Sequence, residues 1–140
     1  MATMRLEIVT AERLVHSEDV DVVVAPGIVG ELAVLPQHAP LLTVLNPGEI
    51  RVVKDGEETF MAVSGGFMEV MGTKVTILAD TAERVDEIDL QRAEAALELA
   101  QERVASAASD MDLERALASI RRSQARMKVA RRGRRPTREV

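Results

Sequence analysis

The spacing of apolar residues changes near Val85, and this change limits the possible folds more sharply than any other feature of the chain. Before it, short segments such as MRLEIV, VDVVVA and IRVVK alternate in polarity or are rich in β-branched residues, as β-strands are. After it, apolar residues recur every three or four positions, which is typical of amphipathic helices. The sequence therefore predicts an all-β region followed by an all-helical one.

Glycine and proline residues divide the first region into short segments. The turn signals are Pro26-Gly27, Gly30, Pro36, Pro40, Pro47-Gly48, Asp55-Gly56, Gly65-Gly66 and Gly72. Their spacing approaches the rhythm of roughly 8–12 residues expected of a sandwich or barrel. Asp55-Gly56 lies between two strand-like segments, and glycine accepts the positive φ of a tight turn, so a β-hairpin is predicted there. Residues 1–86 are thus predicted to form an N-terminal β-sandwich.

The second region has two apolar seams separated by a short break. The seam residues are Leu90, Ala93, Leu97, Ala100, Val104 and Ala107 in the first segment, and Leu113, Ala116, Leu117, Ile120 and Met127 in the second. The break, ASDMD, supplies serine and aspartate for a helix cap. Because so short a break favours antiparallel neighbours, the predicted fold class is an all-β N-terminal sandwich followed by a C-terminal antiparallel α-helical hairpin over residues 87–130.

The first helix is predicted to begin at Asp86. That start would place Asp89 at the third helical position, with Arg92 as its weak surface partner. It would also let Val85 and Leu90 form a hydrophobic staple. The seams are rich in alanine, and each large buried side chain contributes only about 1.5–3 kcal/mol, so packing barely exceeds the entropy of ordering. The hairpin is therefore expected to open.

The net charge of −5 hides an unequal distribution. Residues 1–86 carry 6 basic and 14 acidic side chains, whereas residues 87–140 carry 12 basic and 9 acidic ones. This asymmetry indicates an acidic or phosphate-bearing partner for the second region, with plain solvation as the alternative. Residues 131–140 contain almost no apolar side chain and are predicted to be a disordered basic tail.

The chain carries none of the common catalytic motifs. It has no phosphate-binding loop, no dinucleotide fingerprint and no HExxH motif. His16 and His38 lie too far apart for a local metal motif, and Ser64 beside Gly65-Gly66 is typical of a turn. We expect neither catalysis nor a metal. The absence of cysteine suits a reducing compartment. No segment has the length and apolarity of a signal sequence or a membrane span, so membrane association is expected only through a partner.

The segment PGIVGELAVLPQHAPLL, residues 26–42, allows two interpretations. In the first, its prolines and glycines shape loops at the rim of the sandwich, and His38 is simply solvated. In the second, Glu31 and His38 are polar groups carried on rigid loops, where interaction surfaces tend to lie. Composition alone favours the first interpretation.

Four motifs occur in an order that resembles the epsilon subunit of the F-type ATP synthase, the small rotor-stalk subunit of the F1 sector. They are GELAVLPQHAPLL, VSGGFMEV, VTILADTAER and IDLQRA, and the resemblance covers residues 4–128. It implies a sandwich held between the gamma subunit and the c-ring, with Glu31 and His38 in the rotor contacts, which reverses the preference from composition. It also implies a non-catalytic subunit that requires no cofactor, peripheral at the cytoplasmic face of the bacterial plasma membrane as part of the proton-translocating F1Fo complex.

The resemblance further implies a regulatory hairpin. In similar proteins the hairpin either folds against the sandwich or extends along gamma into the head of alpha and beta subunits, where it restrains ATP hydrolysis. The basic side chains that would then face acidic loops of the catalytic subunits are Arg115, Arg121, Arg122, Arg126 and Lys128. The surplus of positive charge in this region fits such a partner.

A regulatory ATP site is implied by the segment IDLQRA. Some family members bind ATP through an I/L-D-x-x-R-A motif, which residues 88–93 reproduce. The implied site residues are Glu83, Asp89, Arg92, Ala93, Arg122 and Arg126. Independently of the resemblance, an antiparallel hairpin would return the end of its second helix toward Asp89 and Arg92, where clustered arginines at a helix N-terminus favour a phosphate. Leu99 stands where a well-binding member has an arginine, which implies weak affinity.

Two other functions remain open at this point. The first is a nucleic-acid or acidic-protein binding module that uses the basic C-terminal arm. That arm has no aromatic residue to stack on bases, because Phe60 and Phe67 belong to the predicted sandwich, so we expect no nucleic-acid partner. The second is a free-standing β-sandwich with a structural helical tail.

Overall fold

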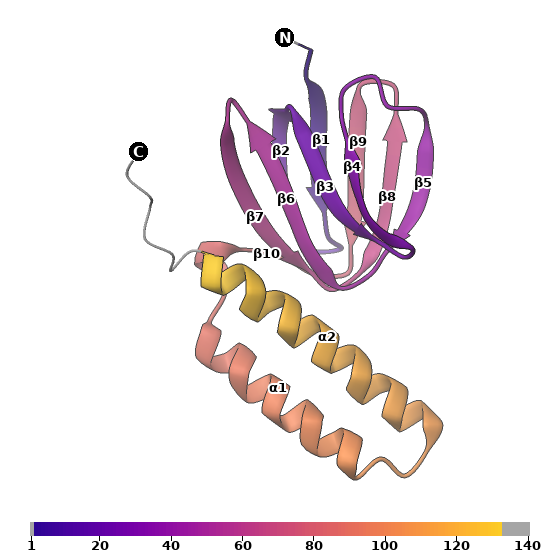
Figure 1. Cartoon of the computed structure of the whole chain (residues 1–140), viewed down its shortest axis with the longest axis vertical. Helices are drawn as coiled ribbons and strands as arrows, with labels where there is room; N and C mark the ends of the chain where they lie inside the picture. The colour runs from indigo at the N-terminus through magenta and orange to yellow at the C-terminus, as the bar shows by residue number, and fades with distance from the viewer. Residues whose placement is uncertain (1, 133–140) are drawn as a thin grey trace.

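The computed structural model describes residues 2–132, and within them ten strands are followed by one 3-10 turn and two α-helices (Figure 1). The strands are β1 (Met4–Val9), β2 (Leu14–Val20), β3 (Val22–Gly27), β4 (Gly30–Val34), β5 (Leu41–Leu45), β6 (Gly48–Lys54), β7 (Glu57–Val63), β8 (Gly66–Met71), β9 (Lys74–Ala79) and β10 (Ala82–Arg84). The helical part consists of η1 (Val85–Glu87), α1 (Leu90–Ala105) and α2 (Asp110–Arg132).

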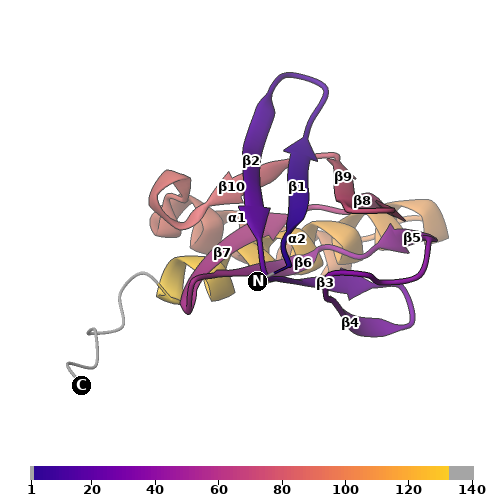
Figure 2. The same cartoon turned by 90° about the horizontal axis from the view of Figure 1, so that it is seen from above.

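The ten strands belong to one hydrogen-bonded sheet that folds over on itself. Their order is β10-β7-β6-β3-β5-β8-β9-β1-β2, and β4 pairs with β3 off this path. The pairings are antiparallel except that of β1 with β9, which is parallel. Figure 1 shows β1 and β2 behind β3 and β6, and Figure 2 shows the β1–β2 hairpin standing away from the other strands. The two layers enclose a single core.

Alternation of apolar and polar residues builds this core. In β1, every second residue from Met4 is buried, and the residues between them face outward. The largest fully buried side chains are Leu6, Ile8, Ile50, Met61, Met68 and Ile77. The interior is thus aliphatic and methionine-rich, since the two phenylalanines lie on outer faces of the sandwich.

The predicted β-hairpin at Asp55-Gly56 is confirmed. Both residues have positive φ, 50° and 79°, and they join β6 to β7 with Lys54 opposite Glu57. Positive φ at both central positions gives the turn a twist that matches the strands on either side. The predicted fold class, a β-sandwich followed by an antiparallel helical hairpin, is confirmed as well.

The start of the first helix differs from the prediction. Residues of η1 form a 3-10 turn, so α1 begins only at Leu90 and Asp89 is its N-cap rather than its third helical residue. The Asp89 carboxylate accepts a hydrogen bond from the Arg92 backbone N–H at 3.1 Å. The predicted staple between Val85 and Leu90 is wrong, because a staple joins the residue before the cap to the fourth helical residue.

The ends of the two helices also differ from the prediction. α1 ends at Ala105, so the last predicted seam residue, Ala107, lies in the connection to α2. α2 continues to Arg132, past the predicted end at residue 130, and Val129 within it is fully buried. The prediction that the disordered tail begins at residue 131 is therefore wrong for Arg131 and Arg132. The remainder of the predicted basic tail, residues 133–140, lies outside the described residues.

The second helix is the middle layer of the helical part. α2 packs against α1 on one side and against β6 and β7 on the other, and η1 also contacts it (Figure 1). Consequently, contacts between the hairpin and the sandwich depend mainly on α2. Neither α1 nor α2 has the length and apolarity required to cross a membrane.

Candidate functional site

The surface beneath α2 carries two carboxylates in one transverse row of the sheet. Glu49 of β6 lies opposite Ala62 of β7, and Ala62 lies opposite Glu83 of β10. Residues in register on neighbouring strands project from the same face, so both carboxylates face α2 with the small Ala62 between them. We call Glu49, Ala62 and Glu83 the carboxylate row.

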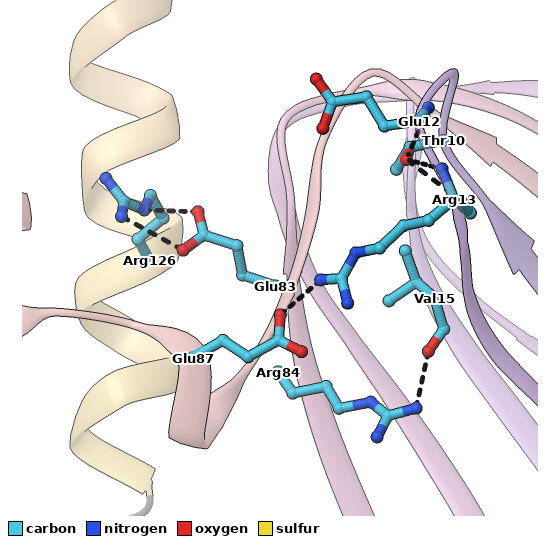
Figure 3. Close-up of polar contacts among 8 residues, drawn as sticks. All are labelled: Thr10, Glu12, Arg13, Val15, Glu83, Arg84, Glu87 and Arg126. Atoms are coloured by element: carbon cyan, nitrogen blue, oxygen red, sulfur yellow. Dashed lines mark hydrogen bonds and ion pairs between the residues drawn. The ribbon is translucent and has the colours of Figure 1, made fainter.

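Arg126 of α2 meets the β10 end of this row (Figure 3). Its Nη2 donates a hydrogen bond to Glu83 Oε2 at 3.1 Å, and its Nε lies 2.7 Å from Glu83 Oε1. The Nε–H is buried and poorly aligned with that oxygen, so the pair has one well-formed hydrogen bond and one close electrostatic contact. Both side chains are more than two-thirds buried, which strengthens the attraction relative to an exposed pair.

Arg132 meets the β6 end of the row. Its Nε and Nη2 donate to the two carboxylate oxygens of Glu49, both at 2.8 Å, in the bidentate geometry that arginine favours. The guanidinium also lies 4.3 Å from the centre of the Phe60 ring, within range of a cation–π interaction. The hydrogen bonds from Arg132 to Glu49 raise the pKa of the guanidinium despite the opposing effect of burial. Lys128 Nζ adds a weaker contact to Glu49 at 3.8 Å.

The connection between sandwich and hairpin has its own polar contacts (Figure 3). Arg13, in the turn between β1 and β2, donates to Glu87 of η1 at 2.7 Å. This hydrogen bond is the main reason that the pKa of the Glu87 carboxyl lies below its usual value. Arg84 donates to the Val15 carbonyl at 2.6 Å. The turn itself is ordered by Thr10, whose hydroxyl oxygen accepts from two backbone N–H groups.

A pocket of about 320 Å³ opens between α1, α2 and the β10 edge of the sandwich. Glu83, Arg122 and Arg126 line it, together with hydroxyl groups from both the sheet and α2. The hydroxyl-bearing residues are Ser64, Thr81, Ser119 and Ser123. Arg122 makes no ion pair with any residue in the described part of the chain. The pocket therefore offers an unpaired guanidinium and several hydrogen-bonding groups to an anion.

The structure brings three of the six residues predicted for an ATP site onto this pocket. Asp89, Arg92 and Ala93 do not line it. Asp89 caps α1 through the backbone of Arg92, and Ala93 is fully buried. Arg126 pairs with Glu83 on the sheet, and Arg122 lines the same pocket, because α2 rather than α1 packs on the sandwich.

The residues predicted for rotor contacts lie at opposite ends of β4. Glu31 follows the β3–β4 turn and is exposed, in register with Pro26. His38 lies in the β4–β5 turn, where its Nδ1 is 2.6 Å from the Ala39 carbonyl. The turn that joins β3 to β4, next to Glu31, exposes Ile28 and Val29 to solvent.

The predicted contacts to catalytic subunits all lie on α2, but in different environments. Arg115, Arg121 and Arg122 are exposed along the first two-thirds of the helix. Arg126 and Lys128 instead face the carboxylate row. A hairpin docked as in this structure therefore leaves only part of the predicted basic surface free.

Sequence reasoning missed an apolar stripe that crosses five strands on the outer face of the sandwich. Val44, Phe67, Leu78, Val9 and Leu14 follow one another in register across β5, β8, β9, β1 and β2. Phe67 and Leu78 are 52% and 54% exposed. The signal was present, because VTIL and GFM place apolar residues on both faces of a strand.

Sequence reasoning also missed Glu49, Phe60 and Arg132 as contacts between the two regions. They lie far apart along the chain and come together only because α2 crosses β6 and β7. Within residues 2–132, no group of three or more His, Cys, Asp and Glu side chains is arranged to hold a metal ion.

Two family models match the chain, one over the sandwich and one over the hairpin, and together they cover almost its whole length. The model of the ATP synthase Delta/Epsilon chain beta-sandwich domain matches residues 3–85. The model of the ATP synthase Delta/Epsilon chain long alpha-helix domain matches residues 86–131.

Individual relatives are similar over nearly their full length. The ATP synthase epsilon chain of Desulforamulus reducens is 50% identical over 128 residues, which cover 91% of this chain and 97% of that protein. The ATP synthase epsilon chain of Herpetosiphon aurantiacus is 53% identical over 128 residues, covering 91% and 94%. Among solved structures, a chain of the Euglena gracilis mitochondrial ATP synthase has a TM-score of 0.79 at 23% identity, covering 89% of this chain and 79% of that one. The last similarity supports the fold.

The protein has two parts, a β-sandwich and a helical hairpin, which are joined by η1. The hairpin packs on the outer face of the sheet. The chain belongs to the ATP synthase delta/epsilon chain family. The epsilon chain of this family is a non-catalytic subunit, and the prediction that the chain is not an enzyme is confirmed on that basis.

Proposed function

We propose that the chain is the central-stalk epsilon subunit of a proton-translocating F1Fo ATP synthase, which joins gamma to the c-ring and restrains ATP hydrolysis through a mobile hairpin. The observation that carries this proposal is the attachment of α2 to the sandwich by a few polar contacts beside small side chains. Such an attachment can be exchanged for another at modest cost. Relatives that match over most of their length are named as epsilon chains, which supports the same role.

The sandwich supplies the rotor contacts in this proposal. The apolar stripe of Val44, Phe67, Leu78, Val9 and Leu14 is well suited to gamma, because exposed apolar patches on a small protein usually mark partner surfaces. The loops at the two ends of β4, with Glu31 and His38, supply further contacts to gamma and the c-ring. The subunit then lies at the cytoplasmic face of the bacterial plasma membrane, peripheral to it and held there by the complex.

The hairpin supplies regulation. When released, α2 would present Arg115, Arg121, Arg122, Arg126 and Lys128 to the alpha and beta subunits of the F1 head. Opposite charge across an interface directs orientation and speeds encounter, so acidic loops are the fitting partner for this helix. The same hairpin, when docked, forms the pocket that contains Glu83, Arg122 and Arg126.

ATP is the proposed ligand of that pocket, as a regulator rather than a required cofactor. Two arginines and several hydroxyl groups suit a polyphosphate. The volume of about 320 Å³ lies at the low end for small-molecule sites, which fits a weak site that responds to high ATP. Because the pocket exists only while the hairpin is docked, bound ATP would favour the docked state, by about 2.7 kcal/mol at a hundredfold excess over the dissociation constant.

Removal of the hairpin tests the division of labour. A chain that ends at Asp86 should still assemble with gamma and the c-ring, because the stripe and the β4 loops are retained. ATP hydrolysis by the assembled complex should rise relative to the complex with the full chain. The measurements are co-purification of the rotor subunits and steady-state hydrolysis, with circular dichroism to verify that the shortened chain folds. Failure of the folded, shortened chain to join the rotor would contradict the proposal.

A further inference from the structure

The spacing of two arginines on α2 matches the spacing of the two carboxylates on the sheet. Arg126 and Arg132 are six residues apart, which corresponds to about 9 Å along a helix. Glu83 and Glu49 lie two strand steps apart, across Ala62, which corresponds to about 9.6 Å. A helix that crosses the strands can therefore place one guanidinium over each carboxylate, and both ion pairs form.

The two arginines flank Val129 on one face of the helix. At about 100° per residue, Val129 lies about 60° from each of them, midway between the two. Val129 is 0% exposed, so the centre of this face is sealed. The arginines thus flank a buried contact and protect it from water on both sides.

The remaining contact between α2 and the sheet is made of small side chains. Ala62 on the sheet and Ser123 and Ala130 on α2 are buried, and none offers much apolar area. Glu49, by contrast, has a side chain only 8% exposed and accepts a bidentate pair of hydrogen bonds from Arg132, whose guanidinium lies over the Phe60 ring. Since apolar burial is limited, the ion pairs carry a large share of the attachment.

We propose that Arg126 and Arg132 form a two-point electrostatic latch on the carboxylate row, and that this latch sets the balance between docked and released hairpin. The proposal deepens the proposed mobility of the hairpin and rests on it. Release frees Arg126 and Arg132 together, so these two side chains serve either the row or an acidic partner, never both. The latch is sensitive to ionic strength, because salt screens its charges once the helix begins to lift.

A distance measurement on the full chain tests the latch directly. The chain has no cysteine, so Thr73→Cys and Ser109→Cys provide two unique labelling sites, one in the β8–β9 turn and one between the helices. Spin labels or fluorophores at these sites report the ratio of docked to released molecules. The ratio is measured from low to high salt in this labelled background and in the same background with each latch substitution.

Arg132→Ala and Glu49→Gln should each lower the docked-to-released ratio by about tenfold at low salt, the effect expected of one charge-assisted bidentate pair. Arg132→Lys should give an intermediate ratio, because the charge is kept and the bidentate geometry is lost. The matched control is Lys74→Ala, which breaks the exposed Lys74–Glu7 pair on the other layer of the sandwich and should leave the ratio unchanged. Thermal unfolding of each variant verifies that the sandwich stays folded.

A charge swap separates pairing from general loss of charge. Arg132→Glu should release the hairpin, and Glu49→Arg added to it should restore docking. An open population that appears with salt but is unaffected by Arg132→Ala and Glu49→Gln would overturn the latch and leave hairpin mobility intact. A chain that stays docked under all salt conditions and in all variants would overturn the mobility itself. If the variant that combines Arg132→Glu with Glu49→Arg were as open as Arg132→Glu alone, that result would also contradict the pairing.

Discussion

Arg126 has two competing partners in the docked hairpin. Its guanidinium is engaged by Glu83, yet it also lines the pocket proposed for ATP. Arg122 lines the same pocket and has no ion-pair partner within residues 2–132. A phosphate that enters would therefore meet Arg122 first and would have to displace Glu83 to reach Arg126. Because Arg122 is unpaired in the described part of the chain and Arg126 is already engaged by Glu83, substitution of Arg122 should weaken nucleotide binding more.

A titration of the isolated chain with Mg-free ATP tests this difference between arginines. Amide resonances around Arg122 and Arg126 should shift at millimolar nucleotide, and Arg122→Ala should remove most of the shift by deleting the unpaired guanidinium. Arg121→Ala is the matched control, since Arg121 is exposed on α2 and does not line the pocket. Shifts that are absent in the unmodified chain, or lost equally in both variants, would rule out ATP binding at this pocket.

The short element η1 contacts α2 and is also tied to the sandwich by a side-chain hydrogen bond. Arg13 comes from the β1–β2 turn and pairs with Glu87, and Arg84 donates to the backbone of β2 (Figure 3). The hydrogen bond from Arg13 keeps the pKa of Glu87 below its usual value. A carboxyl whose pKa is lower when folded adds stability above its unfolded pKa, and this stability is lost as the pH falls through the folded pKa.

The contribution of Glu87 should consequently depend on pH. Glu87→Gln is expected to lower the free energy of unfolding at neutral pH by no more than about 1 kcal/mol, since the pair is partly exposed. The difference in the free energy of unfolding between this variant and the unmodified chain should disappear as the pH falls below the ordinary carboxyl pKa of 4.5. Denaturant unfolding between neutral and acidic pH measures this difference. Glu94→Gln, at an exposed position of α1, is the matched control. A loss of stability at neutral pH equal to that of Glu87→Gln would argue against the Arg13 pairing.

At the scale of the whole molecule, the docked hairpin and the apolar stripe occupy different strands of the sheet. The hairpin docks over β6, β7 and β10, whereas the apolar stripe crosses β5, β8, β9, β1 and β2. The docked hairpin therefore leaves the stripe uncovered, as the exposure of Phe67 and Leu78 indicates. Under the proposed function, a partner could therefore stay on the stripe whether the hairpin is docked or released, as a rotor subunit with a mobile arm would require.

A charge placed in the stripe should disrupt rotor assembly without unfolding the chain. Phe67→Glu is expected to weaken binding to gamma by at least about tenfold, because a large apolar side chain central to an interface usually contributes strongly. The side chain is half exposed, so thermal unfolding should change little. Met111→Glu, at an exposed apolar position of the hairpin, is the control and should bind gamma normally. Equal binding by both variants would show that the stripe is not the gamma surface.

Periodicity alone predicted the fold class and the approximate point where strands give way to helices. It works because the side-chain period of a strand and that of a helix are local properties of the backbone. The turn at Asp55-Gly56 was predictable for the same reason, since positive φ is a property of a few residue types. Family resemblance grouped Glu83, Arg122 and Arg126 as candidate ATP ligands, and in the structure all three line one pocket.

The extension of α2 to Arg132 and the carboxylate row were not accessible from the sequence. Each depends on which helix lies on the sheet. From its composition, a basic segment such as KVARR is predicted to be a solvated tail. In the folded chain its positive charges instead pair with a carboxylate of the sheet. Strand register placed Glu49 and Glu83 in one row of the sheet, and the helical rise spaced Arg126 and Arg132 so that each meets one of these carboxylates. The local sequence thus set what each segment could become, and long-range packing chose which charges would meet.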